Sequence, residues 1–221
     1  MRGMKIGAMA VAALAAGANA QNLMSNGSFE DLGPGFILFT DWDNFNNVFV
    51  DEGVELTAQD GFNSAKMFGQ FGGVQSDQVL LQTVTGITPG MEYTLSAYAQ
   101  HLSTDSVQAG NLVLLQLNFQ NANGDPLGTV QETAIDTLTT PTDAWFQTST
   151  GAVAPDGATQ ILVALLHLQL DGLAEGATFW DNVELIEGDV MTDCPGDFND
   201  DGMLNFFDFV DFINAFNAGC P

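Results

Sequence analysis

The sequence predicts a mainly β protein, an antiparallel β-sandwich that runs from Asn22 to about Ile186. Two observations predict it. Short runs rich in β-branched, aromatic and Leu residues are separated by Gly, Pro, Asn and Asp. In two of these runs apolar and polar residues alternate, which places one strand face in a core and the other in water. Amphipathic helical repeats of useful length are missing from this part of the sequence.

Six segments are the clearest strands, with turn signals between them. In chain order they are Val79–Val84, Glu92–His101, Asn111–Gln120, Trp145–Gly151, Ile161–Leu168 and Thr178–Ile186. The turn signals are Thr88-Pro89-Gly90 and Asn123-Gly124-Asp125-Pro126. Ile161–Leu168 is the longest apolar run of the mature chain. It has the length of a buried strand and falls short of the roughly 20 residues that span a bilayer.

Residues 1–20 have the pattern of a secretory signal. Arg2 and Lys5 form a charged start, an apolar stretch follows from Ile6, and Ala18-Asn19-Ala20 is a small-residue cleavage site. The apolar stretch is too short for a membrane anchor. We therefore expect cleavage before Gln21 and a secreted, extracellular protein.

Charge is the most unusual property of the chain. It has 28 acidic and 3 basic residues, a net charge of −25. Removal of the leader leaves Lys66 as the only basic residue besides His, a formal charge of 1 − 28 = −27. Such a surface repels phosphate backbones and acidic lipids, so nucleic-acid and membrane-surface binding are disfavoured. Salt or divalent cations would relieve the repulsion, although adaptation to high salt would give the same composition.

Three segments resemble the jelly-roll, galactose-binding-like carbohydrate-binding modules that accompany polysaccharide-degrading enzymes. They are Asn22-Leu23-Met24-Ser25-Asn26-Gly27-Ser28-Phe29-Glu30, the stretch from Gln82 to Ser96, and Thr178-Phe179-Trp180-Asp181-Asn182-Val183-Glu184-Leu185. The resemblance implies a jelly roll over residues 21–188 and a carbohydrate ligand. It also implies a structural calcium ion between the first and last strands, with Glu30 and Asp181 contributing. The alternative is two solvated acids.

Carbohydrate recognition needs aromatic faces for stacking and polar groups for sugar hydroxyls. The polar strand faces offer Tyr98, Gln100, Gln116 and Asn118, from strands that would be neighbours in one concave sheet, together with His167. Trp42 and Phe45 would form a loop platform. The alternative for His167 is a buried, satisfied histidine, and Trp145 and Trp180 are expected in the core.

After an acidic linker the sequence changes character. Residues 197–208 fit the calcium-loop template, in which alternating oxygens converge on one ion and Gly202 permits the sharp turn. The predicted ligands are Asp197, Asn199, Asp201, Met203 through its carbonyl, Asn205 and Asp208. The closing Asp resembles dockerins, and the single repeat bounded by cysteines resembles the dockerin-like tails of some secreted bacterial proteins. That resemblance implies that residues 189–221 attach the protein to a cohesin-like or cell-surface partner.

Two further features belong to this tail. Cys194 and Cys220 flank it, and pairing is the default in an exported protein, with free thiols as the alternative. A predicted helix from Asn205 to Ala218 carries one apolar stripe, made of Phe206, Phe209, Val210, Ile213 and Phe216. One short helix cannot bury this stripe against its own loop, so it must pack on the sandwich, on another copy or on a partner.

No convincing catalytic motif is present, and the two histidines are His101 and His167. We therefore expect a secreted, non-catalytic carbohydrate-binding protein with a calcium-binding attachment tail. A structural or adhesion protein of the cell envelope without a glycan ligand is the main alternative. A polysaccharide-active enzyme is a further one, because 28 acids make chance carboxylate pairs inevitable.

Overall fold

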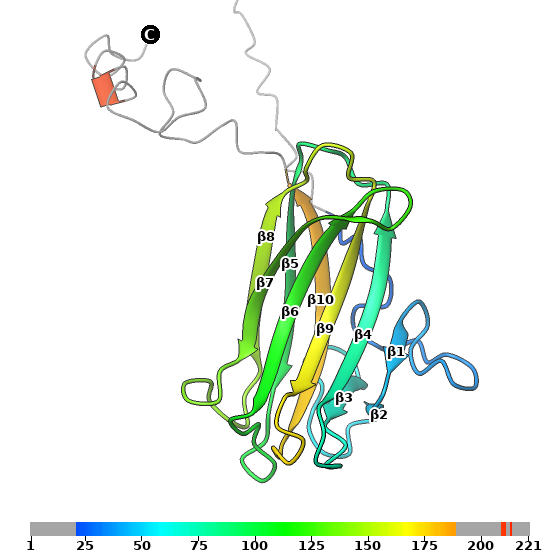
Figure 1. The fold of residues 1–221 in the computed structure, drawn as a ribbon, viewed down its shortest axis with the longest axis vertical. Coiled ribbons are helices and arrows are strands. Elements are labelled where there is room, and N and C mark those ends of the chain that lie inside the picture. The colour runs from blue at the N-terminus through cyan, green and yellow to red at the C-terminus, as the bar shows by residue number, and fades with distance from the viewer. Residues whose placement is uncertain (1–20, 189–208, 211–212, 214–221) are drawn as a thin grey trace, which may run out of the picture.

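The computed structural model describes residues 21–188 together with Phe209, Val210 and Ile213. Residues 21–188 form ten strands in two antiparallel sheets (Figure 1). One sheet has the order β1-β4-β9-β6-β7 and the other the order β2-β3-β10-β5-β8. The strands are β1 (Asp43–Phe45), β2 (Val48–Asp51), β3 (Ser64–Phe68), β4 (Ser76–Thr85), β5 (Glu92–Gln100), β6 (Asn111–Gln120), β7 (Pro126–Ile135), β8 (Phe146–Val153), β9 (Gln160–Gln169) and β10 (Ala177–Gly188).

The predicted fold class, a jelly-roll β-sandwich, is confirmed. From β3 to β10 consecutive strands alternate between the two sheets, except for the hairpin of β6 and β7. The last strand, β10, lies between β3 and β5 in the middle of its sheet. This arrangement packs two inner faces against each other and leaves two outer faces.

All six predicted strands exist, as β4, β5, β6, β8, β9 and β10, whereas β1, β2, β3 and β7 were not predicted. Strand β7 begins at Pro126 and is largely exposed at the edge of its sheet, so it carries little apolar signal. Strands β1 and β2 have three and four residues and lie in an Asn- and Asp-rich stretch. Short strands like these show too few alternations to be recognised.

The inner faces form one apolar core. Its largest fully buried side chains include Trp180, Tyr93, Phe119, Leu95, Leu115 and Ile161. Tyr93 of one sheet meets Phe119 of the other edge to face, with 6.2 Å between the ring centroids. Trp180 is therefore a core residue, as predicted.

The first residues of the sandwich lie along its last strand. Leu23 donates its N–H to the Leu185 carbonyl at 2.8 Å, and Val183 donates to the Gly27 carbonyl at 2.9 Å. A Cβ at position 27 would lie 2.1 Å from the Val183 oxygen, so only glycine permits this approach. The glycine of the Asn-Gly pair in the opening segment is thus explained by main-chain contact.

The predicted tail lies mostly outside the described residues. This applies to the calcium ligands Asp197, Asn199, Asp201, Met203, Asn205 and Asp208 and to Cys194 and Cys220. Phe209, Val210 and Ile213 are helical. In the described part of the chain, no helix is long and apolar enough to cross a membrane.

Candidate functional site

The predicted ligand residues do not share one surface. Tyr98 and Gln100 project from β5 on the outer face of the β2-β3-β10-β5-β8 sheet, and Gln100 is almost fully buried there. Gln116 and Asn118 project from β6 on the outer face of the other sheet. The prediction of one shared concave sheet is wrong, because β5 and β6 are consecutive strands that lie in different sheets.

His167 lies inside the sandwich. It is fully buried, and its Nδ1 lies 2.8 Å from the Thr178 hydroxyl of the opposite sheet. Burial lowers the pKa of His167 to about 4, so the ring is neutral at physiological pH. The buried alternative therefore describes the position of this histidine, although its Nε2 has no hydrogen-bond partner among the described residues, and the ring does not reach a ligand at the surface.

The two aromatic residues of the predicted loop platform are separated by burial. Trp42 is only 2% exposed; its ring packs 5.3 Å from that of Phe29, and its Nε1 donates to the Asn26 carbonyl at 3.0 Å. Trp42 therefore caps the core instead of forming a platform. Phe45 remains exposed on β1. Trp145 is half-buried, with its Nε1 3.0 Å from the Thr57 carbonyl. The prediction that Trp145 lies in the core is therefore wrong.

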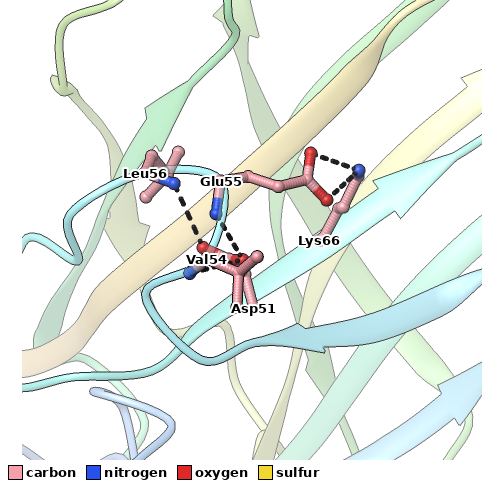
Figure 2. A network of polar contacts seen from close by, with 5 residues as sticks. All are labelled: Asp51, Val54, Glu55, Leu56 and Lys66. Atoms are coloured by element: carbon pink, nitrogen blue, oxygen red, sulfur yellow. Dashed lines mark hydrogen bonds and ion pairs between the residues drawn. The ribbon is translucent and has the colours of Figure 1, made fainter.

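A loop of residues 52–63, here called the covering loop, lies over the outer face of the β2-β3-β10-β5-β8 sheet. Figure 2 shows how it begins: the buried Asp51 carboxylate accepts the N–H groups of Val54, Glu55 and Leu56 at 3.3, 3.1 and 3.4 Å. Glu55 then forms a bidentate ion pair with Lys66, with Nζ–O distances of 2.5 and 2.6 Å (Figure 2). The only lysine of the sandwich is thus used to hold this loop.

Asp181 holds the far part of the covering loop. Its side chain is fully buried; Oδ2 accepts the N–H groups of Gln59 and Asp60 at 2.7 and 2.9 Å, and Oδ1 accepts that of Asn182 at 2.7 Å. Burial raises the pKa of Asp181 to about 6, although the N–H bonds act in the opposite direction. This carboxylate is therefore a structural acceptor at the centre of the sheet.

Glu30 secures the same loop a few residues further on. Its Oε1 accepts the N–H groups of Phe62 and Asn63 at 2.8 and 2.7 Å. Gly61, at φ 74°, leaves room for this carboxylate, because a Cβ there would lie 2.5 Å from it. Glu30 and Asp181, which the resemblance paired, therefore hold neighbouring parts of the same loop, residues 62–63 and 59–60.

The side chains of Glu30, Asp181 and Gln59 supply oxygen atoms of the kind that calcium binds. Gln59 Oε1 is a buried oxygen without a hydrogen-bond partner, in the same loop as the amides that Asp181 accepts. Calcium takes six to eight oxygen ligands from carboxylates, amides and the main chain. In residues 21–188, no three His, Cys, Asp or Glu side chains gather tightly enough to hold a metal. An ion here would therefore need amide or main-chain oxygens beside Glu30 and Asp181.

Three phenyl rings form a row at the other end of the same outer face. Phe49 stacks on Phe68 with centroids 5.1 Å apart and planes inclined by 8°, and Phe68 stacks on Phe71 at 6.4 Å and 16°. Phe49 is 44% and Phe71 45% exposed. The sequence analysis missed this phenyl row because β2 and β3 were not predicted, so nothing placed Phe49 beside Phe68.

The phenyl row leads into a pocket. Phe71, Asp105, Leu173 and Glu175 line a space of about 410 Å³ formed by three separate loops. A second pocket is lined by Leu23, Ser25, Asp41, Gln82, Thr83, Val84 and Thr85 and has no aromatic ring in its lining. The pocket at Phe71 therefore combines flat apolar surface with two carboxylates.

Comparison with known proteins gives the fold. No protein-family profile and no curated protein sequence matches the chain. Among solved structures it is similar to the enzymatically active domain of tailspike protein 4 of bacteriophage CBA120 (15% identity, TM-score 0.53, 76% of this chain and 21% of that one). It is also similar to a cyclase from Fischerella sp. TAU (15% identity, TM-score 0.51, 75% and 96% of the two chains).

These likenesses show the architecture alone. TmCBM61, solved in complex with β-1,4-galactotriose, also aligns over 76% of this chain and 100% of its own, at 14% identity and a TM-score of 0.49. This chain spans about a fifth of the tailspike chain, 21%. Function must therefore be argued from the surface of this molecule.

Proposed function

We propose that this protein is a secreted, non-catalytic carbohydrate-binding protein whose glycan site is the phenyl row and the pocket beside it. The observation that carries the proposal is the near-parallel stacking of Phe49, Phe68 and Phe71, with both outer rings exposed. Exposed phenyl rings leave apolar surface in water, which is unfavourable. The exposed outer rings of such a stack offer apolar surface to the C–H faces of sugar rings.

The pocket supplies the polar half of such a site. Asp105 and Glu175 face it, and carboxylates accept charge-assisted hydrogen bonds from sugar hydroxyls. The strong negative charge of the chain repels anionic polymers. The ligand class that fits is therefore a neutral polysaccharide.

Two observations support a binder over an enzyme. The histidine with the strongly lowered pKa, His167, is enclosed between the sheets, and the carboxylate with the raised pKa, Asp181, is buried under the covering loop. Catalytic acids and bases usually combine a shifted pKa with access to a cleft. Neither group lines the pocket at Phe71.

The glycan site is tested by affinity electrophoresis of the mature chain in gels that contain neutral polysaccharides. We expect retardation by at least one polymer and loss of most of it in the double variant Phe49→Ala, Phe71→Ala, because the stacking surface is removed. Phe146→Ala is the matched control, since Phe146 is equally exposed on β8 outside the row. Full retardation of the double variant refutes this site, and release of reducing sugar would show an enzyme instead.

Calcium completes the proposal at two places. The tail loop from Asp197 to Asp208 binds one ion and, through the attachment role that its resemblance to dockerins implies, links the protein to a cohesin-like or cell-surface partner. The spot between Glu30 and Asp181 binds a second ion, supported by the unpartnered oxygen of Gln59. Both sites need oxygen ligands only, as calcium prefers.

Calorimetric titration separates the two ions. We expect two sites in the mature chain, one after the change Asp197→Ala, Asp208→Ala, and a remaining site that stabilises the sandwich against heat. A titration without heat of calcium uptake refutes both sites. A chelator that leaves the melting temperature of the tail variant unchanged refutes the sandwich site, whereas unchanged cell association after deletion of residues 194–221 refutes the attachment role.

A further inference from the structure

The outer face of the β1-β4-β9-β6-β7 sheet carries an apolar surface, which Gln116 and Asn118 of β6 border and in which Leu114 and Ala164 are already buried. We call it the Leu-rich face; its members project outward from β4, β9 and β6, which lie side by side in Figure 1, and they are Val79, Leu81, Leu112, Leu114, Leu162, Ala164, Leu166 and Leu168. In register, Val79 lies beside Leu166 and Leu166 beside Leu114. Leu112 is 43% exposed at one end. Asp77 is the only charged side chain that projects outward from these three strands.

Such a face is unusual for a sheet in water. An antiparallel strand with one solvated face alternates apolar and polar residues, whereas a strand covered on both faces is apolar throughout. Strand β9 reads Ile161-Leu162-Val163-Ala164-Leu165-Leu166-His167-Leu168, which is the pattern of a strand covered on both faces. Its inner face meets the core at Val163 and Leu165. The sequence of β9 therefore indicates that its outer face is also covered.

The C-terminal segment has the composition to cover it. Phe209, Val210 and Ile213 are helical, and their side chains are 57%, 37% and 37% exposed. On the predicted helix they belong to one apolar stripe, while Asp208 and Asp211 fall on the opposite side. A helix that packed its stripe on the Leu-rich face would keep its acids in water.

The segment is also long enough. The chain continues from Gly188 to Pro221, about 33 residues, which reach roughly 110 Å when fully extended. The strands of the Leu-rich face have ten residues each, a length of roughly 33 Å. Even with Cys194 and Cys220 paired, the six residues from Gly188 to Cys194 span roughly 20 Å when extended, and a helix of 14 residues extends roughly 21 Å further. The tail can therefore reach that face.

Charge favours the chain's own tail over a second copy. Two mature chains each carry a formal charge of 1 − 28 = −27, and their mutual repulsion opposes association. A tethered segment is already close, at an effective concentration near the millimolar range, and residues 189–221 bring seven Asp and no basic residue, against the net charge of −27 of a second chain. We propose that the helix of residues 205–218 packs its apolar stripe on the Leu-rich face of its own sandwich.

This inference does not depend on glycan binding, because the phenyl row lies on the other outer face. It changes what the tail can offer to a partner. A docked helix hides its aromatic stripe, so a partner that recognises the stripe must displace it from the sandwich. The attachment role then belongs to the undocked form.

Photo-crosslinking tests the docking in the full mature chain. Phe209 is replaced by the photoreactive p-benzoylphenylalanine, and the crosslinked peptides are identified by mass spectrometry. We expect links within one chain to peptides from β4, β9 or β6. We further expect loss of most of this product in the variant Leu112→Asp, Leu166→Asp, whereas Leu138→Asp, at an exposed loop position, leaves the yield unchanged.

Three results would overturn the proposal. Links between two chains would identify a second copy as the occupant, links to other strands would place the helix elsewhere, and absence of any crosslink would show an undocked tail. In the first experiment the probe is in the tail and the sandwich is unaltered, so a folding defect of the double variant does not prevent a decision. Far-ultraviolet circular dichroism of the double variant controls for its fold.

Discussion

The two outer faces of the sandwich are covered by different chemistry. One is overlaid by a loop that carboxylates hold through its main-chain N–H groups, and the central anchor, Asp181, is fully buried. The other presents Leu and Val side chains that offer no directional contact. Anchored by hydrogen bonds, a loop has one defined position. A largely apolar face instead sets the kind of surface that covers it and leaves the orientation of that cover open.

Removal of the anchor should have the largest effect. Asp181→Ala leaves the N–H groups of Gln59, Asp60 and Asn182 without their acceptor. We expect a loss of roughly 4 kcal/mol in the free energy of unfolding, at 1.5 to 3 kcal/mol per charged hydrogen bond and partly offset by relief of the buried charge. Urea denaturation measures the loss, and proteolysis of residues 52–63 should accelerate.

Asp125→Ala is the control, because Asp125 also accepts a side-chain hydrogen bond, from Asn121, at an exposed turn. If both variants lose equally little stability, Asp181 does not anchor the covering loop.

The contact between His167 and Thr178, which joins the two sheets, should make folding stability depend on pH. His167 is neutral in the folded state, with a pKa lowered from 6.5 to about 4. The unfolded chain therefore binds the proton first as the pH falls, and folding stability decreases between about pH 6.5 and pH 4, by roughly 3 kcal/mol in total. His167→Asn keeps a polar group near Thr178 and removes the titration.

The comparison of wild type and His167→Asn isolates this effect, because Asp181, with its raised pKa, acts in the opposite direction in both proteins. Thermal unfolding followed from pH 7 to pH 4 should show a steeper loss in the wild type. Parallel pH profiles would contradict a buried neutral histidine.

The Glu55–Lys66 ion pair should contribute least. Its side chains are 40% and 16% exposed, and solvent screens a pair of this kind. Glu55→Gln should lower the unfolding free energy by less than about 1 kcal/mol, and the difference should shrink in 1 M salt. A large, salt-independent loss would mean that the ion pair, and not Asp181, holds the covering loop.

Sequence reasoning found the architecture because long strands carry their own signal. Strand β6 was predicted with its observed bounds, Asn111–Gln120, and β9 within one residue at each end. Alternation within a strand shows which residues face water, but it does not show which strands share a sheet. For that reason Tyr98 and Gln116, both correctly placed on outer faces, were assigned to one site although they lie on opposite sides.

The candidate site was harder to predict for a second reason. The stacking of Phe49, Phe68 and Phe71 depends on the pairing of two short strands and on a loop, none of which has a sequence pattern of its own. Trp42, by contrast, lies between two Asp residues in the sequence, yet its side chain is buried in the apolar core. Long-range packing decides both cases.

The central position of β10 determines when the sandwich is able to form during biosynthesis. β3 and β5 are joined only through β10, and the opening residues 22–27 also bond to it. A nascent chain that ends before Ala177 therefore has a β2–β3 hairpin and a β5–β8 pair with nothing between them. Translation through β10 must therefore precede closure of this sheet.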